Sequence, residues 1–384
     1  MPTRSSSPAR KARSRSPAAA EKRSRSLLLW LVGISLQAIT VLWLLDTPFI
    51  AADPTRIFLA GVASLVAIAA AARHAFKSHG CVFSPSAIFF SLTTWSALVD
   101  LTIAAALVGV TSLGKFYVFQ GEEYFKSSFG FGVLGWDGTF HYVLQLYLAH
   151  ATLLDRPRRV AGLLWCGSIL NSLPVVLLGG ATGTHSATLK PSTLLNAPYI
   201  LAPLLYLHAI LPAASAPPKI KARAPLLGRL RAARVVDHGF ALFHVAAILL
   251  HCFRAAVVLG SLSPLCVAYA AAHEPTLAAT AADAFGPLRV QILEFFFYLA
   301  PFHGWALASA YAPPSETLAC WATVAAGAYL QALCGCYIPS SAFQWVGFGP
   351  LQPATTGALF WGVAAALVVL PPAYAARCWQ QVKP

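Results

Sequence analysis

Charged residues are scarce in this chain. Asp, Glu, Lys and Arg make up 10% of the 384 residues, whereas hydrophobic residues make up 58%. A soluble domain carries roughly 25% charged residues, so this composition excludes an ordinary soluble globular protein. The short segments of alternating hydrophobicity that are typical of a membrane β-barrel are also missing. The sequence therefore predicts an all-α, multi-pass transmembrane helical bundle.

Cysteine pairs at metal-binding spacing are absent as well. None of the eight cysteines forms a CxxC pair, and "CGC" at 334–336 is too tight for a tetrahedral zinc site without other ligands. Most of these cysteines lie in or beside apolar runs, where a thiol behaves as a small hydrophobe. The sequence therefore predicts no metal site, no cofactor and no disulfide framework.

The net charge of +14 does not indicate nucleic-acid binding. Much of it lies in the Ser/Arg/Pro-rich segment 1–26, which has too few apolar residues to build a core and is predicted to be a disordered basic tail. Such a tail helps to set membrane orientation and attracts anionic lipid. An organellar transit peptide is the alternative, because those segments are also rich in Arg and Ser and poor in acids.

Long apolar runs recur along the chain, and each can cross about 30 Å of hydrocarbon as a helix. They predict about ten transmembrane helices of roughly 17 to 25 residues. The predicted helices cover residues 27–45, 57–72, 83–110, 138–154, 161–181, 193–212, 236–260, 288–311, 317–337 and 356–375.

The charges of the connecting loops predict the orientation. Basic residues gather in the tail and at 73–77, 155–159 and 219–234, whereas the alternate loops carry acids. Cytosolic loops of membrane proteins carry the excess of Lys and Arg. Both termini are therefore predicted to lie in the cytosol, with the acidic loops on the lumenal side.

Landmarks repeat on either side of the basic segment 213–235. Gly109 and Gly260 each end an apolar run and lie 151 residues apart, and the same interval separates Glu123 from Glu274. Internal repeats are common in membrane proteins, and ligand sites often lie between the repeats. The expected organisation is a tail at 1–26, two leading helices at 27–82, four-helix units at 83–212 and 236–375, a basic linker at 213–235 and a short cytosolic tail at 376–384.

Several polar side chains fall inside predicted helices, where a charge at mid-membrane costs roughly 2.5–3.5 kcal/mol. Asp137, His141 and Gln145 are spaced four residues apart and share one helical face. Under the predicted orientation, most of these polar groups lie in the lumenal half of the membrane, which suggests a shared lipid cavity. The candidate lining residues are Trp95, Asp100, Trp136, Asp137, His141, Asn196, Tyr199, Arg254, Gln291 and Glu294.

Two other interpretations of these polar residues stay open. In the first, Asp100 or Glu294 pairs with Arg254, and the remaining groups form hydrogen bonds between helices. In the second, the residues form a proton or ion pathway, which would favour a denser series of acids through the full depth of the membrane.

Two stretches resemble a known family. The stretch "GEEYFKSSFGFGVLGWDGTFHYVLQLYL" at 121–148, and "HEPTL" at 273–277 followed by "RVQILEFFFYLAPFHG", are similar to the transmembrane 6 superfamily of lipid-homeostasis proteins. The resemblance covers the chain from about residue 27 to the C-terminus, with gaps. It implies two EXPERA units, the four-helix module of the emopamil-binding sterol isomerase and the sigma-two receptor. It also implies an endomembrane location, in or near the endoplasmic reticulum.

The resemblance assigns roles to individual residues. Glu123 and Glu274 would be structural residues of the lumenal loops, and Asp137 would lie at a helix start, where an acid is favoured. The isomerase uses a His and a Glu one helical turn apart, and here those positions hold Ala104 and Val108. Neither side chain can carry a proton, so no catalytic residue is predicted.

The predicted function is a non-catalytic endomembrane protein that binds a sterol or another lipid and acts in lipid homeostasis. Its predicted partners are membrane lipids and not nucleic acid, while oligomeric partners stay open. One alternative is an enzyme, such as a sterol or lipid isomerase, that uses Asp137, His141 and Glu294. The other is a lipid transporter built on the repeat.

Overall fold

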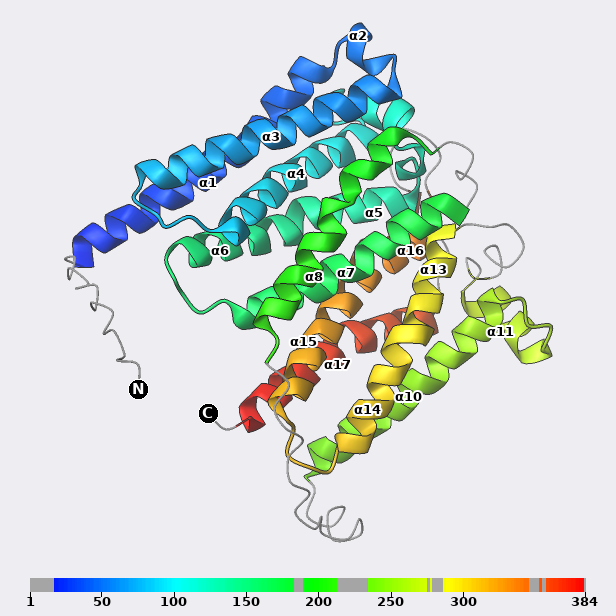
Figure 1. Cartoon of the computed structure of the whole chain (residues 1–384). Coiled ribbons are helices and arrows are strands. Elements are labelled where there is room, and N and C mark those ends of the chain that lie inside the picture. The colour runs from blue at the N-terminus through cyan, green and yellow to red at the C-terminus, as the bar shows by residue number, and fades with distance from the viewer. Residues whose placement is uncertain are drawn as a thin grey trace, which may run out of the picture.

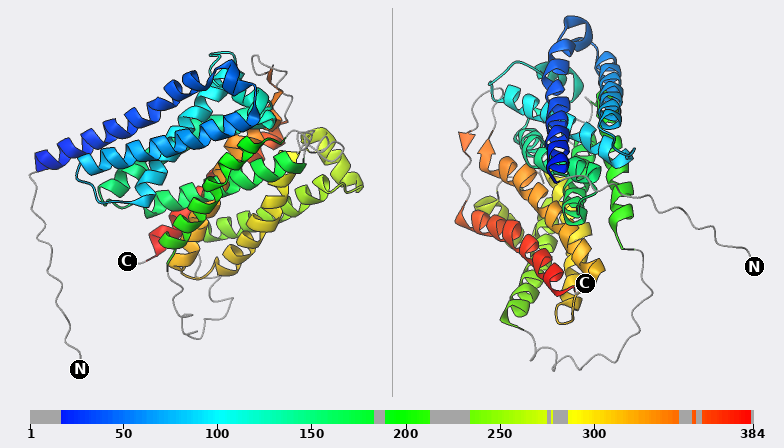
Figure 2. Two further views of the ribbon diagram at one scale, coloured as in Figure 1. Left: turned by 45° about the horizontal axis from the view of Figure 1, so that its top comes forward. Right: turned by 90° about the vertical axis from the view of Figure 1, so that its left-hand side faces the viewer.

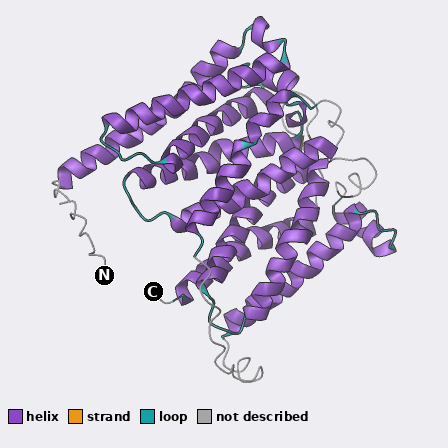
Figure 3. Cartoon of the chain, in the orientation of Figure 1, coloured by secondary structure: helices purple, strands orange, loops and turns teal. Residues whose placement is uncertain are grey.

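Long helices make up nearly all of the structure, a computed structural model that describes residues 17–182, 189–212, 234–274, 277, 286–344, 352–353 and 357–382 (Figures 1 and 3). Two-residue strands, β1 (Phe343–Gln344) and β2 (Gln352–Pro353), pair antiparallel. Among the described helices, eight are long and apolar enough to cross a membrane. The predicted class, a multi-pass helical bundle, is confirmed.

The first half of the chain builds one side of the molecule. Helices α1 and α3 form its outer edge, α4 and the continuous α5–η3–α6 rod lie beneath them, and α7 lies near the centre (Figure 1). The elements are α1 (Pro17–Leu45), α2 (Pro48–Ala51), α3 (Pro54–Ser78), α4 (Pro85–Leu107), η1 (Tyr117–Gly121), η2 (Glu123–Phe125), α5 (Ser128–Trp136), η3 (Asp137–His141), α6 (Tyr142–Leu153), α7 (Arg159–Thr182), η5 (Pro191–Asn196) and α8 (Pro198–Ile210).

The second half of the chain packs against α7 from the other side. The segments α10, α13–α14 and α17 surround α15, which lies against α7 (Figures 1 and 2). The elements are α10 (Val235–Val258), α11 (Pro264–His273), α13 (Gly286–Glu294), η6 (Phe295–Leu299), α14 (Ala300–Ser309), α15 (Glu316–Leu330), η7 (Gln331–Tyr337), α16 (Ile338–Ala342) and α17 (Ala358–Gln381).

Two predicted spans are not among the eight helices that meet the criteria for crossing. They correspond to the helical rods at 128–153 and 286–309, which carry several polar residues each, among them Asp137, His141, Gln291 and Glu294. At about 1.5 Å per residue, both rods are still long enough to cross roughly 30 Å of hydrocarbon.

Local caps explain where several helices begin. The side chains of Asp53, Ser84 and Ser315 accept hydrogen bonds from backbone amides in the first turns of α3, α4 and α15. Pro54 and Pro85 follow two of these caps, and proline is favoured there because the first helical amide has no partner inside the helix.

Two helices begin about ten residues earlier than predicted. Helix α1 begins at Pro17, so the end of the predicted disordered tail is helical. There, Ser24 and Ser26 contact His150 and His79, which fixes the segment to α6 and to the end of α3. Residues 1–16 and most of the predicted linker, 213–233, lie outside the described residues.

The fourth predicted span also begins early. Ser127 caps α5 by accepting a hydrogen bond from Gly130 N at 3.0 Å, and the helix continues without a break through η3 into α6. Asp137 therefore lies well inside a continuous helix. The prediction that Asp137 marks the helix start is wrong, because the Ser127 cap comes earlier in the chain.

Glycines allow α7 and α15 to pack closely. A Cβ atom added to Gly167 would lie 1.9 Å from the carbonyl oxygen of Val324, and one added to Gly327 would lie 2.0 Å from that of Leu164. The arrangement is symmetric, because the same interval of 160 residues separates Gly167 from Gly327 and Leu164 from Val324. The two halves of the chain therefore meet through backbone contact along their third helices.

Candidate functional site

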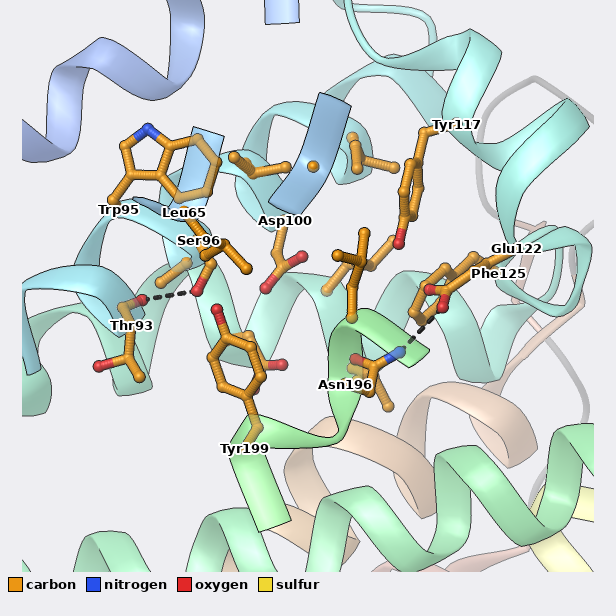
Figure 4. Close-up of a pocket in the computed structure, with 18 of the residues that line it drawn as sticks. Leu65, Thr93, Trp95, Ser96, Asp100, Tyr117, Glu122, Phe125, Asn196 and Tyr199 are labelled. Carbon is orange, nitrogen blue, oxygen red and sulfur yellow. Dashed lines mark hydrogen bonds between the residues drawn. The ribbon is translucent and has the colours of Figure 1, made fainter. Parts of the chain in front are cut away.

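A cavity of about 140 Å³ lies in the first half of the chain, between α1, α3, α4, α5–α6, α7 and the η5–α8 segment (Figure 4). Apolar side chains from all of these segments form most of its wall. They include Leu42, Leu65, Ile103, Phe125, Leu134, Ile169, Leu173 and Leu195. A smaller set of polar side chains shares this wall, so the cavity offers both apolar surface and hydrogen-bonding groups.

Three carboxylates face the cavity. Asp100 points into its centre from α4, close to the place where the Tyr199 hydroxyl turns toward Ser96 (Figure 4). Asp137 reaches the wall from η3, and Glu122 reaches it from the turn after η1. The described residues that line the cavity include no Lys or Arg. A negatively charged ligand would therefore meet acidic groups and no cation on this wall, which opposes its binding.

Glu122 is buried, with 2% of its surface exposed, and accepts a hydrogen bond from Asn196 Nδ2 at 2.8 Å (Figure 4). Burial raises the pKa of its carboxyl to about 7, although the neighbouring Tyr124, Tyr117 and Asn196 side chains lower it. Near neutral pH both protonation states are populated, so Glu122 can either donate or accept a hydrogen bond.

His141 connects the cavity wall to α7. Its Nδ1 lies 2.6 Å from Asp137 Oδ1, and its Nε2 lies 2.5 Å from Ser168 Oγ. This Asp–His–Ser series has the order of contacts found in serine hydrolases. Ser168, however, is fully buried, does not line the cavity and accepts a hydrogen bond from Trp136 Nε1 at 3.0 Å. A substrate in the cavity cannot reach this hydroxyl, so the series braces η3 against α7.

The second half of the chain contains a buried network of histidines. The Tyr329 hydroxyl lies 2.5 Å from His251 Nε2 and 2.5 Å from His303 Nε2, and His303 Nδ1 lies 2.8 Å from His244 Nδ1. All four side chains are fully buried. Within the described part of the chain, no cluster of His, Cys, Asp and Glu side chains could hold a metal ion.

A buried ion pair lies beside this network. The Arg254 guanidinium contacts both carboxylate oxygens of Glu274, which also accepts hydrogen bonds from the hydroxyls of Tyr269 and Tyr337. Burial raises the pKa of Tyr269 to about 12, although Arg254 opposes this shift. The Glu274 carboxylate therefore finds its hydrogen-bond and ion-pair partners within the protein.

The part of the chain that matches a family model includes the whole cavity wall. A family model described as transmembrane 6 superfamily member 2-like, transmembrane domain, matches residues 37–221, and this range contains every cavity-lining residue. Transmembrane 6 superfamily member 2 of Homo sapiens is 31% identical over 261 residues, which are 66% of this chain and 68% of the relative. The chain belongs to the transmembrane 6 superfamily. The protein of that name from Mus musculus is 29% identical over 308 residues, 78% of this chain and 79% of the relative, and no solved structure matches.

Six of the ten predicted lining residues meet in the cavity of this transmembrane 6 superfamily protein. They are Trp95, Asp100, Asp137, His141, Asn196 and Tyr199. The other four lie elsewhere. Trp136 donates to Ser168, Gln291 exchanges hydrogen bonds with Asn171, and Arg254 pairs with Glu274 instead of Asp100 or Glu294. Glu294 is on α13, and its buried Oε2 has no hydrogen-bond partner among the described residues.

The structural counterpart of Glu274 is Glu122, one residue before the predicted Glu123. Both follow a helical segment with similar backbone angles, φ −136° and ψ 84° at Glu122 and φ −139° and ψ 67° at Glu274. Glu123 instead lies 3.8 Å from Lys126. A repeated Tyr-x4-Glu pattern, from Tyr117 and Tyr269, carries this alignment and is the signal that could have identified Glu122.

Ala104 and Val108 occupy the positions at which the resemblance places the isomerase acid and base. Neither residue lines the cavity, whereas the preceding turns of α4 present Trp95, Ser96 and Asp100 to it. The polar groups of this cavity therefore come from residues other than Ala104 and Val108.

Proposed function

We propose that this protein binds a sterol or another neutral lipid in the first-half cavity and acts in lipid homeostasis. The observation that carries the proposal is the Asp100 carboxylate, which points into an otherwise largely apolar space with no basic partner on the wall (Figure 4). A lipid hydroxyl can form a hydrogen bond with this carboxyl group. The hydrocarbon part leaves the lipid phase and not water, so close packing against the apolar wall, and not the hydrophobic effect, stabilises it there.

A second polar group in the wall supports a ligand that can also accept a hydrogen bond. The Trp95 side chain is buried, and its Nε1 has no hydrogen-bond partner among the described residues. A buried unsatisfied donor costs about 1–3 kcal/mol, which a ligand oxygen would recover. A hydroxyl, which donates and accepts, fits this pair of groups better than a purely apolar molecule does.

The size of the cavity limits how such a ligand is held. About 140 Å³ is smaller than the roughly 300–1,000 Å³ of sites that enclose a drug-sized molecule. We therefore expect the polar end of the lipid to occupy the cavity while its remaining length extends between helices. Helix α3 and the η5–α8 segment are equally the least buried of the surrounding spans, so their parting is the simplest way to admit it.

The loop charges support the orientation proposed for this activity. The start of α1 and the end of α17 lie at the same end of the bundle, together with the basic α6–α7 connection (Figure 1). Asp46, Asp53 and Glu122 lie toward the other end of the first half. By the positive-inside rule, both termini face the cytosol. The location in an endomembrane such as the endoplasmic reticulum rests on the family resemblance alone.

Acid–base catalysis on a lipid is the second candidate function. It is favoured by one observation, the 2.6 Å contact between Asp137 and His141 on the cavity wall, because a carboxylate can orient a histidine for proton transfer. Glu294, the third residue that the sequence suggests for an enzyme, lies outside this cavity. Turnover of a labelled sterol by the purified protein, lost in His141→Gln, would favour this candidate over simple binding.

Photocrosslinking of a clickable sterol to the purified protein tests the binding proposal. Asp100→Asn and Leu65→Trp, which fills the cavity from α3, are expected to weaken labelling about tenfold. Leu59→Trp on the same helix is the matched control, because that side chain is 59% exposed. Glu294→Gln, a buried acid outside the cavity, is the second control. Labelling that free sterol does not compete away, or that all four variants reduce equally, would reject the proposal.

A further inference from the structure

We propose that a groove at the basic end of the first half binds the phosphate group of an anionic phospholipid. The groove has a volume of about 610 Å³ and shares no lining residue with the lipid cavity. It lies where the start of α1, the α3–α4 connection and the α6–α7 connection meet, at the left-hand end of Figure 1. Its lining residues are Arg23, Gly80, Val82, Phe83, Ser84, Thr152, Leu153, Leu154, Asp155 and Arg156.

Arg23 is held in the groove with donor capacity to spare. Its Nη2 donates to the Gly80 carbonyl and lies 3.3 Å from Cys81 Sγ, which ties the guanidinium to the α3–α4 connection. Its buried Nε has no hydrogen-bond partner among the described residues. A guanidinium presents several N–H donors in a planar fork that matches phosphate oxygens, so a preorganised Arg23 suits this ligand.

Arg156 supplies a second positive charge on the opposite wall. Helix α6 ends in a turn in which Asp155 adopts φ 53° and Arg156 N donates to the Ala151 carbonyl, so the backbone at Arg156 is fixed. The Asp155 carboxylate, which also borders the groove, is fully exposed and lies 3.7 Å from Arg158. Its charge is therefore screened by water and by Arg158, and the groove retains a positive character.

The rim of the groove indicates a membrane lipid rather than a soluble anion. Val82 and Phe83 are 77% and 63% exposed beside the arginines, and the Arg73 guanidinium lies 5.5 Å from the Phe83 ring centroid. Apolar and cationic side chains side by side are typical of protein surfaces at the headgroup level of a bilayer. Leu29 and Trp30 on α1 continue this exposed apolar surface toward the membrane core, where the acyl chains of a bound phospholipid would lie.

The cavity is lined by acids and no Lys or Arg, whereas the groove is lined by two arginines, so the two sites would select different lipids. The groove sits at the helix ends that carry the excess of basic residues, and cytosolic leaflets hold the anionic lipids of a membrane. Its occupant does not enter the acidic cavity. Binding of an anionic phospholipid here would anchor α1 to α3 and α6 without any contribution from the sterol site.

The test is crosslinking of a photoactivatable phosphatidic acid to the full-length protein in phosphatidylcholine nanodiscs. Unlabelled phosphatidic acid is expected to compete, and R23Q/R156Q is expected to weaken labelling about tenfold. The matched control, K22Q/R25Q, removes two neighbouring cations of α1 that do not line the groove and is expected to change labelling less than twofold. Because Arg156 is exposed and its side chain holds no structural contact, R156Q alone keeps the test valid if the double variant misfolds.

Three results would overturn the proposal. If phosphatidylcholine competed as well as phosphatidic acid, the site would not recognise the net negative charge of the headgroup. Equal losses in R23Q/R156Q and K22Q/R25Q would reduce the effect to general surface charge. Competition by inorganic phosphate alone, at concentrations at which phosphatidic acid fails, would identify a soluble anion as the ligand. Sterol labelling in R23Q/R156Q reports on the cavity separately, so failure of one site is distinguishable from failure of the other.

Discussion

The two halves of the molecule have similar backbones and different interiors. Gly109 and Gly260 end α4 and α10 with nearly the same left-handed geometry, φ 84° and 83°. A wide helical turn interrupts the second rod of each half, at η3 and at η6. Glycines 160 residues apart then bring α7 and α15 into contact. These three landmarks align the halves helix by helix.

Under this alignment, the wall of the first-half cavity corresponds to the histidine network of the second half. At the interval that separates Gly109 from Gly260, Thr93 and Asp100 correspond to His244 and His251. Thr93 and Asp100 line the cavity, whereas His244 and His251 are fully buried among other side chains.

The next two helices extend this correspondence. At the interval that relates η3 to η6, Gln145 corresponds to His303, and at the interval that relates the packed glycines, Ile169 corresponds to Tyr329. Gln145 and Ile169 line the cavity, while the Tyr329 hydroxyl contacts both His303 and His251. Larger side chains thus fill in the second half the space that stays open in the first.

The acids at the loop ends differ in the same way. Glu274 is paired with Arg254, whose aligned position in the first half holds Ile103. Glu122 therefore faces the cavity without a cation. The second half thus satisfies its loop acid Glu274 internally, whereas the first half leaves its loop acid Glu122 beside an open space.

The largest expected effect tests whether the halves meet as symmetrically as their backbones indicate. Gly167→Leu and Gly327→Leu each force a side chain into a carbonyl oxygen of the facing helix, so each should cost at least about 3 kcal/mol of folding free energy. Thermal unfolding in detergent measures both.

Gly135→Ala and Gly304→Ala are the controls, one in each half, because no atom lies within 4 Å of the added Cβ. They should change stability by less than about 1 kcal/mol. A large loss in only one of the two leucine variants would contradict a symmetric interface.

The second prediction concerns the two aligned acids. Glu274→Gln leaves the Arg254 charge buried without its partner and should cost about 3–5 kcal/mol. Glu122→Gln breaks no ion pair and should cost less than about 1 kcal/mol. Thermal unfolding of the two variants side by side gives the comparison, and Arg254→Met combined with Glu274→Gln should recover most of the loss. Equal losses in the two single variants would show that Glu122 also has a buried cationic partner.

The third prediction concerns the hydroxyl that fills the second half. Tyr329→Phe removes the group shared by His251 and His303 and should cost about 1–3 kcal/mol, because both imidazoles lose a buried partner. Tyr199→Phe, in which the lost hydroxyl faces the cavity, should cost less than about 1 kcal/mol. Chemical denaturation can rank the two variants, and a reversed ranking would contradict the contrast between a filled and an open interior.

The smallest expected effect is on pH dependence. The Glu122 carboxyl has a pKa of about 7 in the folded protein against 4.5 for the unperturbed group. Between these values the folded state binds more protons than the unfolded state, so stability should fall as pH rises from 4.5 to about 7. Melting temperatures of the wild type and Glu122→Gln across this range measure the difference. The same slope in both proteins would mean that Glu122 is not the responsible group.

The sequence alone determined the class of this protein and the approximate positions of its long helices, and it indicated a repeat. Apolar runs long enough to span a bilayer and glycines at a constant interval are local features of the chain, so they can be read without coordinates. The helical periodicity also placed Asp137, His141 and Gln145 on one face, and all three line the cavity.

Only the tertiary structure decided which polar residues share a cavity. Periodicity gives the face on which Asp100 or Arg254 lies, but the partner of that face depends on how the helices dock, and docking is set by distant contacts such as Gly167 against Val324. A cavity is space that no side chain fills, so it depends on the volumes of residues from several helices at once. For this reason the sequence could suggest a lipid-binding interior, while the folded chain alone showed that the open space lies in the first half and that Glu122 borders it.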